Sequence, residues 1–227
     1  MKVAEIFYSV QGEGMLLGMP SVFVRASGCN LRCVWCDTPY ASWSPEGEDW
    51  SVEAILAEVR RYPARHVVVT GGEPMIMPDV VGLSQALHRA GYHITIETAG
   101  TVFQPVYCDL MSISPKLSNS TPRAPEHARW VGQHERLRIQ PEVLRKLVRS
   151  YSYQLKFVVC APEDIAEIRA LVRELEADRE RVLLMPEAIE PEQLRERARW
   201  LIELCKQEGY RYTPRLQIEL WGQRRGV

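Results

Sequence analysis

The sequence SGCNLRCVWCDT, residues 27–38, holds three of the chain's six cysteines, Cys29, Cys33 and Cys36. Three thiolates on one short loop can bind three irons of a 4Fe-4S cluster, and the lack of a fourth cysteine nearby leaves one iron open to a ligand. A zinc knuckle is the alternative, but structural zinc needs four ligands, which usually come in two pairs. The spacing therefore favours an iron–sulfur cluster that takes part in chemistry.

The other three cysteines, Cys108, Cys160 and Cys205, stand singly and are expected to be small buried hydrophobic residues. Six cysteines in 227 residues are too few for a disulfide scaffold, and clustered thiols in a reducing compartment more often hold a metal. Glu5 interrupts the apolar stretch that a signal peptide would need. A cytoplasmic protein is therefore expected.

The overall charge and the apolar runs exclude two classes of partner. Lysine and arginine total 28 against 29 aspartate and glutamate, a net charge of -1 that indicates neither nucleic acid nor an anionic membrane. No segment reaches the roughly 18 consecutive apolar residues of a membrane-spanning helix. We therefore expect a small-molecule partner.

Apolar runs alternate with stretches of helical period along the whole chain, which is typical of βα units and a mainly parallel sheet. The composition, 46% hydrophobic and 25% charged, is that of a globular protein, and the length suits one domain over residues 1–227. An α/β fold, a single-domain partial (β/α) barrel, is therefore predicted. The expected strands are 4–8, 21–26, 65–70, 93–97, 110–114, 154–159 and 182–185, and the expected helices are 51–62, 79–90, 142–150, 165–175 and 192–209. Residues 116–138 lack periodicity and are expected to form a long surface loop.

A second motif, Thr70-Gly71-Gly72-Glu73-Pro74, follows the third predicted strand. Taken alone, it is most simply a tight turn that closes the strand. The two glycines also allow the backbone to come close to a ligand, which a side chain would block.

Together, the cysteine spacing and the glycine-rich segment resemble the radical S-adenosylmethionine superfamily. Further segments resemble the 7-carboxy-7-deazaguanine synthase family within it; they are residues 5–14, 23–25, 36–38, 97–101, 114–116 and 221–227. The resemblance implies a radical S-adenosylmethionine lyase in queuosine and deazapurine biosynthesis. It would convert 6-carboxy-5,6,7,8-tetrahydropterin into 7-carboxy-7-deazaguanine by a radical, Mg2+-assisted ring contraction with loss of ammonia. It also implies a homodimer and an electron donor such as flavodoxin or ferredoxin.

The resemblance also assigns site residues, none of them a protein acid, base or nucleophile. Cys29, Cys33 and Cys36 would hold the 4Fe-4S cluster, and Thr38 would bind Mg2+, whereas without the resemblance Thr38 before Pro39 is a turn residue. The residues expected to contact S-adenosylmethionine are Gly71, Gly72, Glu73, Ser114 and Lys116. Those expected to contact the pterin are Gln11, Glu13, Gly14, Arg25, Thr70 and Glu97.

Several of these residues have a plainer interpretation. Arg25 at the end of an apolar strand could pair with the substrate carboxylate or with an internal acid such as Glu5 or Glu97. Trp35 could shield the cluster from water or simply pack. The five histidines, His66, His88, His93, His127 and His134, lack metal-site spacing and are expected to be structural or solvated.

Two positions depart from the family pattern. Ala99 stands where many relatives have asparagine, and Gln217 stands where many have a histidine, so side-chain contacts in the pterin pocket are expected to be redistributed. Two other functions fit the cysteines alone: a glycyl-radical activating enzyme that acts on a protein partner, and a non-catalytic iron–sulfur or zinc module.

Overall fold

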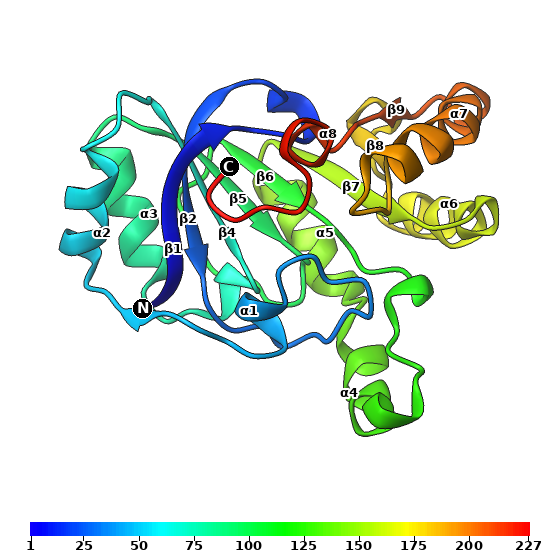
Figure 1. Cartoon of the computed structure of the whole chain (residues 1–227), viewed down its shortest axis with the longest axis horizontal. Helices are drawn as coiled ribbons and strands as arrows, with labels where there is room; N and C mark the ends of the chain where they lie inside the picture. The colour runs from blue at the N-terminus through cyan, green and yellow to red at the C-terminus, as the bar shows by residue number, and fades with distance from the viewer.

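A single nine-stranded sheet runs through the computed structural model, which describes all of residues 1–227 (Figure 1). Its order is β3-β1-β2-β4-β5-β6-β7-β8-β9, with β1 antiparallel to both β2 and β3 and all later neighbours parallel. The strands are β1 (Lys2–Val10), β2 (Pro20–Ala26), β3 (Glu48–Asp49), β4 (His66–Gly71), β5 (His93–Thr98), β6 (Leu110–Ile113), β7 (Tyr153–Val159), β8 (Val182–Pro186) and β9 (Arg211–Tyr212). The two edge strands do not pair, so the sheet is an open, partial (β/α) barrel, which confirms the predicted fold class.

Eight α-helices accompany the sheet. They are α1 (Pro39–Ser42), α2 (Val52–Val59), α3 (Val80–Arg89), α4 (Ala128–Leu137), α5 (Pro141–Ser150), α6 (Ile165–Glu174), α7 (Pro191–Glu208) and α8 (Leu216–Trp221). Short 3-10 turns are η1 (Gly14–Leu16), η2 (Pro74–Ile76), η3 (Ser118–Ser120), η4 (Pro125–His127), η5 (Pro162–Asp164) and η6 (Arg179–Arg181). Figure 1 shows α8 and the C-terminus in front of the sheet, while α4 projects from the body. No helix is both long and apolar enough to cross a membrane.

The predicted helix ends are confirmed at two caps. The Ser51 hydroxyl accepts the backbone N–H of Ala54 at 3.1 Å and so caps the start of α2. At the end of α7, Gly209 adopts φ 69°, the left-handed conformation that glycine tolerates best. All seven predicted strands and all five predicted helices are present, each within a few residues of its expected ends.

The expected long surface loop over residues 116–138 is wrong, because this segment contains η3, η4 and the ten-residue helix α4. Prediction of a helix depends on a stripe of buried apolar residues, and α4 has none: its one buried residue is His134. The two-residue strands β3 and β9 and the short helices α1 and α8 also escape prediction, since each is too brief to display a period.

The strands divide their residues between two faces of the sheet. Because successive side chains alternate across a strand, Val69, Ile96 and Phe157 join the 37-residue core beneath the helices. The neighbours Thr70, Glu97 and Lys156 point to the opposite face, where they line a cavity. These polar side chains therefore lie on the inner face of the barrel, and the other face of the sheet packs on the apolar core.

Candidate active site

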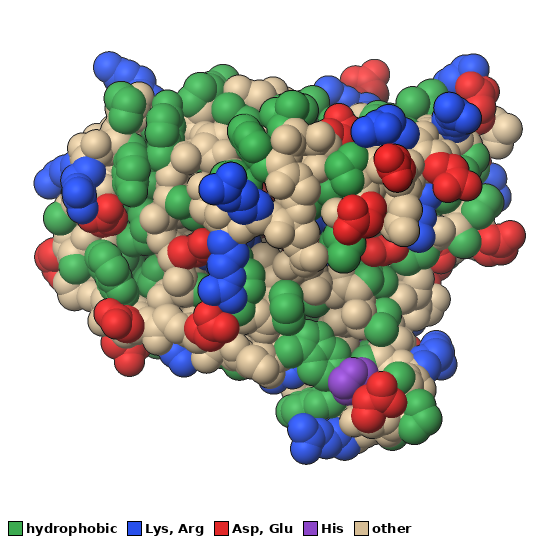
Figure 2. Space-filling view, in the orientation of Figure 1, with side chains coloured by type: hydrophobic (Ala, Val, Ile, Leu, Met, Phe, Trp, Pro, Cys, Tyr) green, Lys and Arg blue, Asp and Glu red, His purple; other side chains and the backbone are tan.

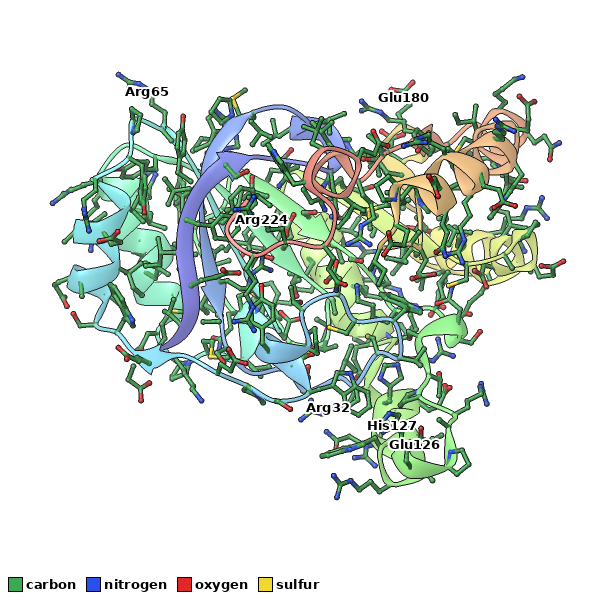
Figure 3. All side chains as sticks on the ribbon, viewed as in Figure 1. Arg32, Arg65, Glu126, His127, Glu180 and Arg224 are labelled. Atoms are coloured by element: carbon green, nitrogen blue, oxygen red, sulfur yellow. The ribbon has the colours of Figure 1, made fainter.

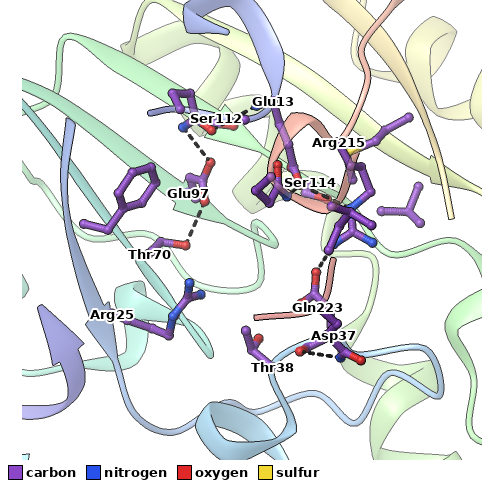
Figure 4. Close-up of a pocket in the computed structure, with 18 of the residues that line it drawn as sticks. Glu13, Arg25, Asp37, Thr38, Thr70, Glu97, Ser112, Ser114, Arg215 and Gln223 are labelled. Carbon is purple, nitrogen blue, oxygen red and sulfur yellow. Dashed lines mark hydrogen bonds and ion pairs between the residues drawn. The ribbon is translucent and has the colours of Figure 1, made fainter. Parts of the chain in front are cut away.

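A cavity of about 430 Å³ lies on the inner face of the sheet, and its walls come from most of the strands. Figure 4 shows Thr70, Glu97, Ser112 and Ser114 from neighbouring strands on one side, with Asp37 and Thr38 from the cysteine loop opposite. The C-terminal residues 223–227 also line it. Ligands in open parallel sheets bind beyond the carboxyl ends of the strands, and most of these residues stand there.

The cavity contains a network of buried charges centred on Glu13. Its carboxylate pairs with Lys156, accepts from Gln217 at 2.8 Å and lies 3.4 Å from the Arg215 guanidinium. Burial alone would raise the pKa of Glu13, but the charges of Lys156 and Arg215 outweigh burial and lower it to about 2. Glu13 is therefore ionised at neutral pH and available as an acceptor.

Glu97 joins this network from β5. It accepts the Thr70 hydroxyl at 2.7 Å and the Gln11 amide at 3.3 Å, and it lies 3.7 Å from the Lys156 ammonium. The structure thus brings four of the residues expected to contact substrate, Gln11, Glu13, Thr70 and Glu97, into one hydrogen-bonded network beside the buried Lys156, in which the two carboxylates accept.

Arg25 forms an ion pair with an internal acid, Glu5, which is one of the two partners that the sequence allowed. Its Nε lies 2.7 Å from Glu5, which also accepts the Tyr40 hydroxyl at 2.7 Å. The guanidinium nevertheless lines the cavity and points into it in Figure 4. Because only Nε binds Glu5, the terminal nitrogens of Arg25 are free for an anionic ligand.

The three clustered cysteines lie together outside the cavity wall, in a small apolar cluster with Leu31, Trp35, Ala99 and Leu137. All three are free thiols. Burial is the main cause that raises the pKa of the Cys33 thiol, to about 12, so metal binding at these thiols would release protons. This donor set fits a 4Fe-4S cluster, in which each thiolate binds a different iron.

The structure does not support the zinc alternative. Structural zinc requires four ligands, and the cysteine loop brings only three thiols together, with no second pair of ligands beside them. Thr38 lies at the junction between cysteines and cavity, with its hydroxyl 3.8 Å from the Cys36 sulfur. That hydroxyl makes no capping bond to α1 and remains available as an oxygen ligand.

The glycine-rich segment packs directly on the start of the cysteine loop. Gly72 donates to Ala26 and Glu73 donates to Gly28 through their backbones, at 3.0 and 2.9 Å. A Cβ on Gly72 would lie 2.1 Å from the Gly28 carbonyl oxygen, and Gly71 adopts φ 129°. Only glycine fits at these two positions, which present bare backbone to the cavity.

Most of the predicted site residues line the cavity: Gln11, Glu13, Arg25, Thr38, Thr70, Gly71, Gly72, Glu97, Ser114 and Lys116. Glu73 and Gly14 do not. The fully buried Glu73 carboxylate accepts from Met75, Thr98 and Ala99. Gly14 packs against the Gln154 amide and donates to the Thr213 hydroxyl at 2.7 Å. Both residues support the cavity walls through these contacts but do not line the cavity.

Polar lining residues that escape the sequence-based site include Lys156, Ser112 and Arg215. Lys156 carries a readable signal, since it is a charged residue inside the apolar strand YQLKFVV. Arg215 follows Pro214 after a two-residue strand and carries no such signal. The departures from the family pattern are both at the site: Gln217 donates to Glu13, and Ala99 packs with the cysteines.

His134 links α4 to the cysteine loop. Its Nδ1 accepts the backbone N–H of Arg32 at 3.1 Å and its Nε2 lies 2.9 Å from the Ser120 hydroxyl. Burial lowers the pKa of His134 to about 4, so the ring is neutral at pH 7 and can accept from Arg32.

This depressed pKa predicts an acid-sensitive contact. The contribution of His134 to stability is complete above its unfolded pKa, about 6.5, and is lost as the pH falls toward 4. We expect the variant His134→Gln, which keeps an acceptor but does not titrate, to lose less stability than the parent between pH 7.5 and pH 5. Urea unfolding at both pH values, under anaerobic conditions, measures the difference. Equal losses in the two proteins would contradict the prediction.

Comparison with known proteins gives consistent similarities. The model of the Radical SAM superfamily matches residues 23–116. The 7-carboxy-7-deazaguanine synthase of Rhodopirellula baltica is 47% identical over 99% of this chain and 88% of its own length. That of Halobacterium salinarum is 45% identical over 97% of this chain and 90% of its own. The crystal structure of QueE from Escherichia coli superposes with a TM-score of 0.71 at 28% identity, covering 95% of this chain and 93% of that one.

Proposed function

The chain belongs to the 7-carboxy-7-deazaguanine synthase family of radical SAM enzymes, and we propose that it forms 7-carboxy-7-deazaguanine from 6-carboxy-5,6,7,8-tetrahydropterin with release of ammonia. The observation that carries the proposal is one cavity with carboxylates on one wall and Arg25 on another, beside three clustered thiols. Because the similarity to this family covers nearly the full chain, we prefer this function to the two alternatives, the glycyl-radical activating enzyme and the non-catalytic module.

We assign the cluster to Cys29, Cys33 and Cys36, and S-adenosylmethionine to the adjoining wall. The backbone of Gly71 and Gly72 would receive the methionyl amino end, while Ser114 and Lys116, which bind each other at 2.7 Å, would contact the rest of the cofactor. When bound, the cluster and S-adenosylmethionine supply the reductive cleavage that generates a 5'-deoxyadenosyl radical. Glu73 fixes this wall through its three internal hydrogen bonds.

The remaining walls suit a carboxylated pterin. Its aminopyrimidinone edge offers N–H donors and a carbonyl acceptor, and Gln11, Glu13 and Glu97 present acceptors and an amide donor toward the cavity. Arg25 would take the 6-carboxylate with its terminal nitrogens while Glu5 holds Nε. Thr70 orients Glu97. Because Gly14 has no side chain, it leaves room for the Gln154 side chain, which supports the cavity wall.

We assign Mg2+ to Thr38. A hydroxyl is a neutral, hard oxygen ligand, and Mg2+ often takes only one or two protein ligands while substrate and water complete its octahedron. The neighbouring Asp37 pairs with Arg215, so it steadies the loop and leaves Thr38 as the protein ligand.

The assembly proposed here is one domain over residues 1–227 that forms a homodimer and takes electrons from a protein such as flavodoxin or ferredoxin. A cytoplasmic location agrees with three thiols that must stay reduced to hold a cluster. We place the reaction in queuosine and deazapurine biosynthesis, as the resemblance implies; the name of the relatives, 7-carboxy-7-deazaguanine synthase, gives the product.

The proposal is tested with the anaerobically reconstituted enzyme, S-adenosylmethionine, dithionite, Mg2+ and 6-carboxytetrahydropterin. Mass spectrometry is expected to detect both 5'-deoxyadenosine and 7-carboxy-7-deazaguanine. The same mixture without added Mg2+ tests the metal assignment, and a slower reaction is expected there. Formation of 5'-deoxyadenosine without the deazapurine would contradict the substrate assignment while leaving the radical machinery intact.

A further inference from the structure

We infer that the Ser42 hydroxyl donates a hydrogen bond to the Cys36 sulfur and thereby raises the reduction potential of the iron–sulfur cluster. Ser42 lies on the short helix α1 and does not line the cavity assigned to the substrate. The inference rests on the proposed function, in which the three clustered cysteines hold the cluster. Ser42 acts through Cys36, so it is a positioning residue and not a catalytic one.

The Ser42 hydroxyl lies close to two acceptors, a sulfur and a carbonyl oxygen. Its oxygen is 3.1 Å from the Cys36 Sγ and 3.3 Å from the Thr38 carbonyl oxygen. A hydroxyl has only one hydrogen to donate, and its bonds to oxygen are usually about 2.5–3.0 Å long. The distance to the carbonyl is therefore long, whereas 3.1 Å is a close approach to the larger sulfur atom. The hydroxyl hydrogen therefore points to the sulfur.

Iron binding decides which of the two groups donates. A free Cys36 thiol could itself donate to Ser42, but a cysteine binds iron as the thiolate, which has no hydrogen. The Thr38 hydroxyl lies farther from this sulfur, at 3.8 Å, and it is assigned to Mg2+. With the cluster in place, the Ser42 hydroxyl is therefore the donor and the Cys36 sulfur is the acceptor.

Both neighbours of Ser42 in the sequence are hydrogen-bonded to the cysteine loop. The Ala41 carbonyl accepts the Gly28 N–H at 2.8 Å, and the Trp43 ring N–H donates to the Cys33 carbonyl at 3.0 Å. These two bonds fix the backbone on each side of Ser42 relative to the cysteines. The hydroxyl is therefore held at the sulfur in the way that outer hydrogen-bond partners hold the ligands of a metal.

The contact is also shielded from water. Ser42 is only 3% exposed. Figure 2 shows the surface over α1 filled by packed side chains, and the cysteine loop, marked by Arg32 in Figure 3, runs beside that helix. A hydrogen bond in such surroundings is electrostatically stronger than one in water, because the local dielectric constant is lower.

The hydrogen bond favours the reduced form of the cluster. Reduction adds one electron, which makes the cluster and its thiolates more negative, and the hydroxyl directs its positive hydrogen at one of these thiolates. Hydrogen bonds to the sulfurs are among the factors that set the reduction potential of iron–sulfur clusters. Loss of the Ser42 hydroxyl should therefore lower the potential and make the cluster harder to reduce.

The experiment measures the cluster itself. The parent and Ser42→Ala are reconstituted anaerobically and titrated with dithionite and redox mediators in the absence of S-adenosylmethionine, so that the electron stays on the cluster. Electron paramagnetic resonance counts the reduced cluster. At the midpoint potential of the parent, we expect the ratio of reduced to oxidised cluster to be about threefold to tenfold lower in Ser42→Ala; tenfold corresponds to about 59 mV for a one-electron couple. Ser42→Thr keeps a hydroxyl and should restore most of the ratio.

Ser44→Ala is the matched control, because Ser44 is an exposed serine on the same segment. It should leave the ratio unchanged. An equal fall in Ser44→Ala, or no fall in Ser42→Ala at equal iron content, would overturn the inference. Equal falls in Ser42→Ala and Ser42→Thr would also overturn it, since the hydroxyl would then not be the cause. A parent without the signal of a reduced cluster would refute the cluster assignment, whereas failure to form the deazapurine would refute only the proposed substrate.

Discussion

Replacing Lys156 by methionine is expected to destabilise the protein by about 3 kcal/mol and to lower product formation at least about a hundredfold. Lys156 is buried and pairs with Glu13 and Glu97, and removal of one partner of a buried ion pair leaves an uncompensated charge. The pKa of Glu13, now about 2, would rise, because its largest favourable contribution comes from Lys156. Urea unfolding and the deazapurine assay measure the two effects.

Two further variants identify the cause. Lys206→Met removes an exposed lysine that pairs with Glu203 three residues earlier, and it should cost less than about 1 kcal/mol. Lys156→Met/Glu13→Gln removes both charges of the Lys156–Glu13 pair, and it should recover at least about 1 kcal/mol of the loss. Were Lys156→Met no more harmful than Lys206→Met, the network would have no part in stability.

The substitution Gly72→Ala is expected to cost more than about 3 kcal/mol and to abolish binding of S-adenosylmethionine. The added Cβ would lie 2.1 Å from the Gly28 oxygen and 2.4 Å from the Ala41 oxygen, and neither backbone atom can rotate away. Relief of the clash requires the glycine-rich segment and the cysteine loop to separate. Unfolding by urea and equilibrium binding of S-adenosylmethionine test both consequences.

A glycine on α4 supplies the control. A Cβ at Gly132 would have no heavy atom within 4 Å, so Gly132→Ala should stabilise the protein by about 0.5–1 kcal/mol through better helix propensity. Unaltered cofactor binding in Gly72→Ala would show that the cofactor does not depend on the close contact between the two loops.

The parallel sheet is predictable from the sequence because each strand is a short apolar run bounded by polar turns. Helix α4 is not, since its single buried side chain is a histidine whose role depends on Arg32, a residue far away in the sequence. The spacing of apolar residues predicts helices that pack against the core, but it misses a helix that is held by polar contacts.

Some residues of the candidate site can likewise be predicted from the sequence, and others cannot. The cysteines and glycines are predictable because their spacing reflects local geometry. The partners of Arg25 are not, because Glu5 and Glu97 are equally plausible acids until the β1–β2 register places Glu5 opposite Arg25. Arg215 reaches Glu13 and Asp37 only through the full topology of the sheet, which no local pattern encodes.

The span of the Arg215 contacts also constrains how the protein is made. The cysteine loop and the glycine-rich segment lie within residues 23–74, whereas the charged network of the cavity needs Arg215 and Gln217 from near the end of the chain. During synthesis the cluster-binding half therefore emerges long before the cavity can close. The charged network can therefore form only once α8, which carries Gln217, has been made.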